Sequence, residues 1–356
     1  MRKILNFKSF LNESFDASVI LFEKYIEFLA EDAVALTQVS TKVGWDKIKA
    51  GFEQTSDPEN RKTLAKQGRK IRSAPLLGAA GSNPKLAKEQ GTIPDFVTKS
   101  LSLSPADESG RINTCSCATE ECRAACLNKA GRGAMTTTQK GRLKKTDFMI
   151  DNPHHFMSML KDEISTHGRS AESAGKRAAV RLNVVSDIPY EILHPQIFTE
   201  HPNVQFYDYT KIARRVLNTD GTPRKLPDNY HLTLSSTGIH KESNWGDVRQ
   251  HLSNGGVAAM VFAVPSGRGK KPGGALPTHV VDGSTGKRWR VIDADIHDHR
   301  HLDHAYNDAQ PGEGLIAGLR IKGGKKLLAK AGNFAVRIPE GESVVTVPDH
   351  SKDDTD

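Results

Sequence analysis

Every cysteine of the 356-residue chain lies in one short stretch, NTCSCATEECRAACLNKAGRG, at positions 115, 117, 122 and 126. Thiolates are soft ligands that select zinc or iron–sulfur centres, so a cluster of this kind indicates a metal site. A secreted disulfide framework spreads its bridges along a short chain and does not show this pattern. The alternative is that the four thiols are buried as small apolar side chains. Because that would require four such residues to coincide in an otherwise cysteine-free chain, we predict metal binding.

The spacing of these cysteines allows three or four sulfur atoms to converge. Thr119 is expected to cap a short helix on which Cys122 and Cys126, four residues apart, share one face. Cys115 and Cys117 precede this helix in an extended or irregular stretch, where alternate residues share a side. A zinc ion would use all four thiolates in a closed tetrahedral site, whereas an iron–sulfur cluster can use three and leave one iron open. The spacing alone leaves both centres open.

Polar side chains are expected at the carboxyl ends of three successive strands. They are Ser186 and Asp187, then Thr210 and Lys211, and finally Ser235. Barrel enzymes carry cofactor-binding and catalytic groups at these strand ends, although polar residues there also serve in plain turns. The residues predicted to bind a cofactor are Ser186, Asp187, Thr210 and Ser235. Asp187 and Lys211 are also predicted to be catalytic.

A second stretch, DADIHDHRHLDH at 293–304, is rich in metal-ligating residue types. On an extended strand its alternate residues would share one face and could hold a metal ion. These residues are Asp293, Asp295, His297, His299 and His301. The alternative is a solvated polar loop, in which histidine is freely used.

Short apolar or β-rich runs alternate with helical patterns through most of the chain. The strands are predicted at 179–185, 204–210, 230–235, 257–264 and 315–321, and helices at 154–166 and 245–255. This alternation is typical of βαβ units with a parallel sheet. About six strands, apolar on both faces, favour a partial βα (TIM-like) barrel over an open doubly wound sheet. The predicted fold class is therefore α/β, a partial barrel with an N-terminal helical extension.

Composition divides the chain into four parts. Residues 1–13 form a short basic segment, and residues 14–75 have a helical pattern that is clearest at 15–43. A connector with glycine and proline near 73–85 leads into the barrel-like domain, which we place at 76–340. The acidic residues 341–356 are predicted to be a disordered tail.

The formal net charge of +8 is compatible with nucleic acid or another polyanion as a partner. Basic residues cluster only at 66–72, 142–145, 268–271 and 322–326, and such runs usually form solvated surface. No apolar run reaches the roughly 18 residues of a membrane span, and no secretory signal is evident. A reducing compartment is expected. Phosphate-loop, dinucleotide-binding, HExxH and nucleophile-elbow motifs do not occur, which argues against the enzyme classes that use them.

Several separated motifs together resemble an uncharacterised phage and prophage family, the gene-product-88-like proteins. They include LSLSPADESGRINTCSCATEECRAACLNKAGRG, AVRLNVVSDIPYE, VQFYDYTKI, NYHLTLS and VIDADIHDHRHLD, and they span about 101–323. The family's usual three cysteines fall on Cys115, Cys122 and Cys126, and Cys117 departs from the pattern. The resemblance also favours Asp298 and Arg300 as residues for substrate or phosphate, which we predict as catalytic, with Lys322 beside them.

Two further resemblances bear on cofactor and location. Three cysteines at the start of a βα barrel are similar to those of radical S-adenosylmethionine enzymes, in which a [4Fe–4S] cluster binds S-adenosylmethionine. The spacing here departs from the usual C-x3-C-x2-C. The N-terminal NFKSFLNES resembles the capsid-targeting leader of internal head proteins in tailed phages, with cleavage expected between Glu13 and Ser14.

The leading hypothesis is a phage-encoded iron–sulfur enzyme, similar to radical S-adenosylmethionine enzymes, that acts in the host cytoplasm on a small molecule or nucleotide. A zinc-stabilised module that binds nucleic acid is the second hypothesis. A third is an internal virion protein packaged with the phage capsid. A membrane partner is not expected.

Overall fold

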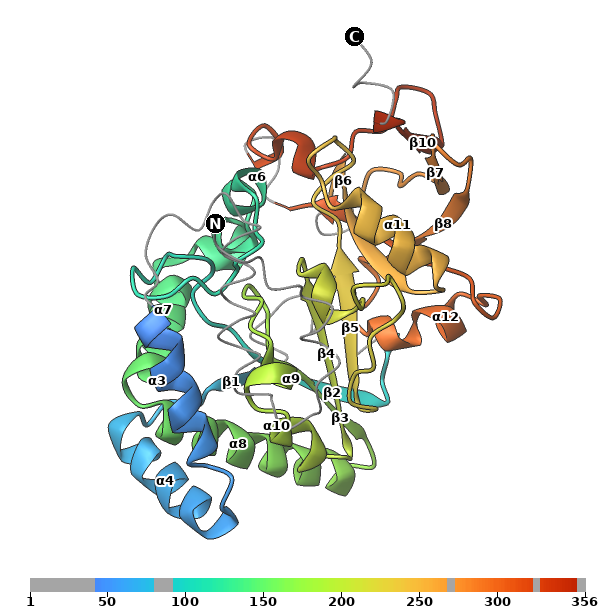
Figure 1. The fold of residues 1–356 in the computed structure, drawn as a ribbon. Coiled ribbons are helices and arrows are strands. Elements are labelled where there is room, and N and C mark those ends of the chain that lie inside the picture. Colours follow the sequence, from blue (N-terminus) through green and yellow to red (C-terminus); the bar gives the residue numbers. More distant parts are fainter. Residues whose placement is uncertain (1–41, 80–91, 268–272, 323–326, 351–356) are drawn as a thin grey trace, which may run out of the picture.

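The computed structural model describes residues 42–79, 92–267, 273–322 and 327–350 (Figure 1). The leader at 1–13 and nearly all of the helical pattern at 15–43 lie outside these residues. The strands are β1 (Leu77–Ala79), β2 (Phe96–Leu101), β3 (Arg177–Arg181), β4 (Val204–Thr210), β5 (Tyr230–Ser235), β6 (Val257–Pro265), β7 (His279–Asp282), β8 (Arg288–Asp293), β9 (Leu315–Ile321) and β10 (Val344–Val347). The α-helices are α3 (Lys42–Glu53), α4 (Pro58–Ile71), α6 (Glu120–Ala124), α7 (Thr136–Asp151), α8 (Pro153–Ser173), α9 (Tyr190–Leu193), α10 (Gln196–Thr199), α11 (Trp245–Ser253) and α12 (Asp303–Tyr306). Short 3-10 helices are η3 (Leu127–Lys129), η4 (Gly131–Ala134), η5 (Ala213–Arg215), η6 (Arg300–Leu302) and η7 (Gly332–Phe334).

The described strands form one mixed sheet in the order β1-β2-β3-β4-β5-β6-β9-β8-β7-β10. Neighbours from β2 through β6, and on through β9 to β8, are parallel. Strand β1 is antiparallel to β2, and β7 is antiparallel to β8. The predicted α/β fold with a largely parallel sheet is confirmed. The sheet has two edge strands, β1 and β10, so it is not closed.

Strands β2 to β6 follow one another in both chain order and sheet order. In a doubly wound sheet this order reverses at a switch point, and no reversal occurs among these five strands. Crossovers between parallel strands are right-handed, so a run without reversal places the connecting segments on one face. Alternate strand residues point to opposite faces, and the two faces therefore have different surroundings.

The covered face of the sheet packs against helices. Val180 and Phe206 share a hydrophobic core with Phe156 and Ile164 of α8. Trp45, Ile48 and Phe52 of α3 and Ala65 of α4 belong to the same core. Figure 1 shows α3 and α4 beside α8, so the described helices before residue 75 pack directly on the sheet domain.

The opposite, inner face carries more polar side chains. The cross-strand registers pair Ala179 with Gln205, Tyr209 with Thr233, and Ser235 with Ala259. Because alternate residues share a face, Arg181, Tyr209, Ser235 and Ala259 all lie on this face. Lower on the same face, Tyr207 packs with Ala179 and Phe96. A ligand can meet the sheet on the inner face, because Arg181, Tyr209, Ser235 and Ala259 line an open cavity there.

The histidine–aspartate stretch does not have the predicted conformation. Strand β8 ends at Asp293, and the chain then turns into η6 and α12, so the extended strand is wrong beyond that residue. The solvated loop is also wrong, since His297, His299 and Arg300 are buried. The His299 ring lies 4.8 Å from the Phe96 ring and 5.0 Å from the Tyr207 ring, between centroids. The stretch is part of the packing beneath the inner face.

Most of the predicted strands agree with the structure. The runs at 204–210, 230–235 and 315–321 match β4, β5 and β9, while the first strand begins two residues earlier and ends at Arg181. Five of the described strands lacked a prediction. Strands β1, β7 and β10 have only three or four residues, and β2 and β8 mix apolar residues with polar or charged ones. The predicted disordered tail starts too early: Val344–Val347 forms β10, parallel to β7, with Val345 and Val347 buried.

Candidate functional site

A cavity of about 960 Å³ opens at the carboxyl ends of β2, β3, β4, β5 and β9. Its lining includes most of the residues predicted for a site: Cys115, Cys122, Cys126, Ser186, Asp187, Thr210, Lys211, Ser235, Asp298 and Lys322. These residues come from separate segments between positions 115 and 322. Cys117 and Arg300 do not line the cavity.

The cysteine segment is held by the short helices α6 and η3 and by hydrogen bonds to the loop that follows β3. The Thr119 hydroxyl caps α6 by accepting from the Cys122 N–H at 3.2 Å, which confirms the predicted cap. Helix α6 ends at Ala124, so the prediction that Cys126 lies on the same helix as Cys122 is wrong. Cys126 instead caps η3, and its Sγ accepts from the Asn128 N–H at 3.4 Å.

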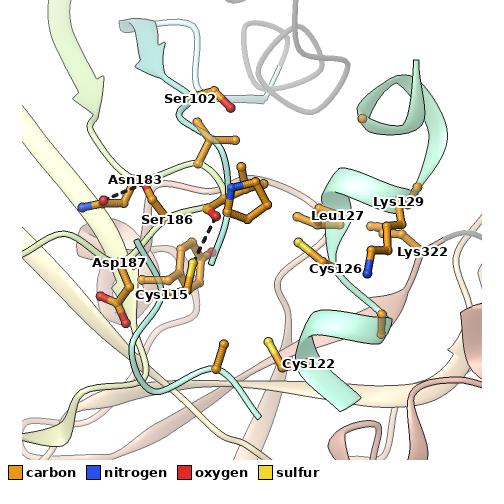
Figure 2. Close-up of a pocket in the computed structure, with 18 of the residues that line it drawn as sticks. Ser102, Cys115, Cys122, Cys126, Leu127, Lys129, Asn183, Ser186, Asp187 and Lys322 are labelled. Carbon is orange, nitrogen blue, oxygen red and sulfur yellow. Dashed lines mark hydrogen bonds between the residues drawn. The ribbon is translucent and has the colours of Figure 1, made fainter. Parts of the chain in front are cut away.

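Cys115 faces the other two cysteines across the cavity. Figure 2 shows its thiol beside Ser186 and Asp187, and the thiols of Cys122 and Cys126 on the opposite wall. The Cys115 thiol donates to the carbonyl of Val185 at 3.3 Å. All three cysteines are half-buried and none is in a disulfide. Burial raises the pKa of the Cys115 thiol to about 12 and also raises the pKa of Cys126.

Lys211 is a cation that interacts electrostatically with two of these thiols, Cys122 and Cys115. Burial opposes its charge, but the neighbouring Cys122, Asp187 and Cys115 outweigh that effect and raise the pKa of its amine. The amine also lies 5.3 Å from the centre of the Phe334 ring. The structure therefore places a charged lysine among the cysteines, which the sequence analysis predicted only as a strand-end residue.

Asp187 ties the cysteine segment to β4. Its backbone N–H donates to the carbonyl of Thr114 at 2.7 Å, and its carboxylate accepts from the Lys211 N–H at 2.8 Å and the Thr210 hydroxyl at 3.1 Å. The buried Arg215 completes an ion pair with the same carboxylate. Because its carboxylate is held by three donors, Asp187 is suited to positioning the site.

Asp298 and Arg181 form the floor of the cavity. The Asp298 carboxylate accepts from Arg181 Nη1 at 2.7 Å and from the Tyr209 hydroxyl at 2.8 Å. Arg300, in contrast, is 1% exposed and pairs with Asp303 at 3.2 Å below the cavity. The predicted contact of Arg300 with substrate has no support from this position, and the role of Asp298 stays a prediction.

The remaining predicted cofactor residues are hydroxyls at the cavity wall. Ser186 donates to Asn183 Oδ1 at 2.9 Å, and Thr210 accepts from the Ile212 N–H at 3.0 Å. Ser235 lines the cavity at the end of β5. The Ser186 and Thr210 hydroxyls donate their protons to Asn183 and Asp187, so each can contact a ligand as an acceptor through a remaining lone pair.

Arg142 and Lys145 line the cavity as well, and the sequence analysis grouped them with surface charge. They are three residues apart on α7, a spacing that puts both on one helix face. The spacing could have predicted that the two side chains share a face of the helix. Only the packing of α7 shows that this face is turned toward the cysteines.

A closed four-cysteine zinc site would bring four sulfurs within about 2.3 Å of one point. In the described ranges, no three histidine, cysteine, aspartate or glutamate side chains lie close enough to hold a single metal ion. Cys117 packs against the main hydrophobic core. This arrangement does not match a closed four-cysteine zinc site.

None of the described helices combines the length and apolar character that a membrane span requires.

Comparison with known proteins supplies the family. The model of the family described as gene product 88 matches residues 72–332, which is more than half of the chain. No curated protein matches, and no solved structure matches. The similarity to radical S-adenosylmethionine enzymes therefore gains no support from the comparisons. Since the family match covers the cysteine segment, all strands from β1 to β9 and every cavity-lining residue except Phe334, the chain belongs to the gene product 88 family.

Proposed function

We propose that this protein is an iron–sulfur enzyme in which Cys115, Cys122 and Cys126 hold a cluster at the cavity. The observation that carries the proposal is the division of the cysteines: three line one cavity, and the fourth, also half-buried, packs against the hydrophobic core instead. A chain that used its cysteines only for packing would not place three of four half-buried around the same open space.

The size of the group follows from the spacing of the ligands. A single zinc ion needs its ligands within one small shell, and the described residues do not provide one. An iron–sulfur cluster is several ångströms across and takes its cysteines from separated positions. The open cavity beside the three thiols favours a [4Fe–4S] cluster with one iron free to bind a ligand.

Charge also favours this assignment. Three thiolates and the cluster sulfides carry net negative charge, which is costly in a partly buried site unless a cation compensates it. Lys211 provides that cation between Cys122, Cys115 and Asp187. When bound, such a cluster supplies one-electron transfer to a molecule held beside it.

We further infer that the inner face of the sheet is the wall of a partial βα barrel. The chain order of β2 to β6 and a cavity at the carboxyl ends of these strands support it. Ser186, Thr210 and Ser235 would bind a cofactor of the S-adenosylmethionine type through their hydroxyls. Asp187 and Lys211 would orient it, and Asp298 would hold the floor through Arg181 and Tyr209.

Metal analysis after anaerobic purification tests the proposal. The protein should be brown, absorb broadly near 400 nm, and carry about four iron and four sulfide per chain. A colourless protein with one zinc per chain would instead support the zinc-stabilised, nucleic-acid-binding module. A protein with neither metal after reconstitution with iron and sulfide would refute both metal sites.

A further inference from the structure

We infer that the cavity binds a phosphate-bearing substrate against a basic wall formed by Lys129, Arg132, Arg142 and Lys145. This inference rests on the proposed function, because it assigns a substrate class to the same cavity. The four residues come from η3, η4 and the inner side of α7, next to Cys126. Figure 2 shows Lys129 on the wall that carries Cys122 and Cys126.

The carboxylates of the cavity do not neutralise this wall. Each is bound to a different donor of the protein: Asp107 to Arg123, Glu108 to Asn128, Asp187 to Arg215, and Asp298 to Arg181. Asp107, Asp187 and Asp298 are thus paired with other cations, whereas Glu108 lies close to the wall, with the Asn128 amide between it and Arg142. The basic wall contributes positive charge in excess.

The cations of the wall are held by neutral oxygens. Arg142 Nε donates to the Ser102 hydroxyl at 2.8 Å, and its Nη1 donates to the amide oxygen of Asn128. Lys145 Nζ donates to the carbonyl of Leu76 at 2.6 Å, and Lys129 Nζ to the carbonyl of Arg123 at 3.0 Å. Among the described residues, no carboxylate forms an ion pair with these three side chains. These bonds fix the positions of the cations and leave their charge for a ligand.

Burial raises the cost of these positive charges. Together with the neighbouring cations Arg72 and Arg142, it lowers the pKa of Lys145 to about 8, and Glu163 opposes this only in part. Burial also lowers the pKa of Arg142, against the opposing influence of Cys126 and Glu108. A cation that is partly removed from water without an ionic partner costs free energy, and an anion bound beside it recovers that cost. Arg132 is exposed at the mouth of the cavity, where it can meet an incoming anion.

Phosphate fits this wall better than a single carboxylate does. The exposed Arg132 can place its guanidinium fork on two oxygens of a phosphate, and a lysine adds a point charge to a third oxygen or a second phosphate. The hydroxyls of Thr137, Thr138 and Ser100 line the same part of the cavity and can donate to further oxygens. A carboxylate carries one charge and would leave most of these donors unused.

Isothermal titration calorimetry of the full-length protein with inorganic pyrophosphate tests the inference by measuring affinity and stoichiometry. The matched variants are Arg142→Gln and Lys145→Gln, with Lys144→Gln as the control, an exposed lysine of the same helix that does not line the cavity. We expect one pyrophosphate per chain, with affinity reduced roughly tenfold or more in each test variant and changed less than about twofold in the control. Arg142→Lys should recover part of the affinity, which separates lost charge from local unfolding.

Two further ligands identify the source of the phosphate. If adenosine 5′-monophosphate binds more tightly than pyrophosphate, the substrate is a nucleotide. If a single-stranded DNA decamer binds most tightly of the three, the substrate is the end of a nucleic-acid polymer. Failure of all three ligands, or an equal loss in the Lys144→Gln control, would overturn the inference. Repeating the titration with Cys122→Ser separates the two proposals, since phosphate binding should persist in protein that has lost its iron.

Discussion

The cysteine segment, 115–126, and the histidine–aspartate segment, 297–303, are the two parts of the chain richest in metal-ligating residue types. The first is irregular backbone with short helices after β2, and three of its thiols are half-buried on a cavity. The second turns under the inner face of the sheet, and His297, Asp298, His299, Arg300 and Asp303 are all buried there. Similar compositions therefore serve different purposes.

The difference lies in what surrounds each segment. The histidine rings pack on Phe96 and Tyr207, and Arg300 pairs with Asp303 inside the protein. Three thiols of the cysteine segment face an open cavity, where Lys211 lies close to Cys122 and Cys115. Residues of metal-ligating types form a candidate site where the fold leaves a cavity between them. Where the fold leaves no cavity, the same residue types pack into the protein interior.

Among the variants considered, Asp303→Ala should have the largest effect, which is a loss of folding stability. The Asp303 and Arg300 side chains are each 1% exposed and lie 3.2 Å apart. Removing one partner leaves a buried charge without compensation, which costs about 3–5 kcal/mol of the free energy of unfolding. Asp151→Asn breaks the exposed pair with Arg111 and should cost about 1 kcal/mol or less.

Urea unfolding measures both variants. Iron content per folded chain should be the same in Asp303→Ala and the wild type. If Asp303→Ala kept its stability and lost its iron, the assignment of this segment to the core would be wrong.

Acid should weaken the fold through the histidine segment. Burial first, and neighbouring histidines and Arg300 second, lower the pKa of His231 to about 3, of His299 to about 4 and of His301 to about 3. The unfolded chain takes up protons near the ordinary histidine pKa of about 6.5, so it binds more protons than the folded chain below that pH. Stability should therefore be complete above about pH 6.5 and decline as the pH falls toward 4, by about 2 kcal/mol or more in total.

Unfolding curves at pH 7, 6, 5 and 4 follow this decline. His301→Phe keeps an aromatic ring and removes one titrating group, so its stability should depend less steeply on pH. An unchanged slope in His301→Phe would show that the histidine segment does not cause the acid sensitivity.

Lys211→Met tests the charge at the cysteine segment, with a smaller expected effect. A cation next to a cluster stabilises the reduced form, so its removal should lower the reduction potential by an amount on the order of 50–100 mV. The control is Lys287→Met, an exposed lysine beside Trp289 that does not line the cavity. Equal potentials for Lys211→Met and the wild type in a redox titration would remove Lys211 from the site.

The sequence allowed much of the sheet and most of the cavity lining to be predicted. Strands β4, β5 and β9 are apolar enough to be recognised locally, and polar residues at their ends, such as Lys211 and Ser235, follow from the geometry of parallel strands. The cysteine cluster was visible because the rest of the chain has none. Its helix was placed incorrectly because α6 ends two residues before Cys126.

What could not be predicted depends on tertiary packing. Arg142 and Lys145 look like surface charge until α7 is seen against the cavity. The histidine segment looks exposed because it is polar, and only its position between Phe96 and Tyr207 shows why it is buried. Strand β10 was hidden in an acidic tail because four residues are too few for a periodic signal.

The most direct test of the central claim compares iron content in Cys117→Ser and Cys122→Ser after the same anaerobic reconstitution. Both variants make the same chemical change within one segment, but only Cys122 lines the cavity. We predict that Cys117→Ser binds about as much iron and sulfide as the wild type, with the same visible spectrum, and that Cys122→Ser loses most of both. Equal losses in the two variants would contradict a three-cysteine cluster and indicate a site that needs all four thiols.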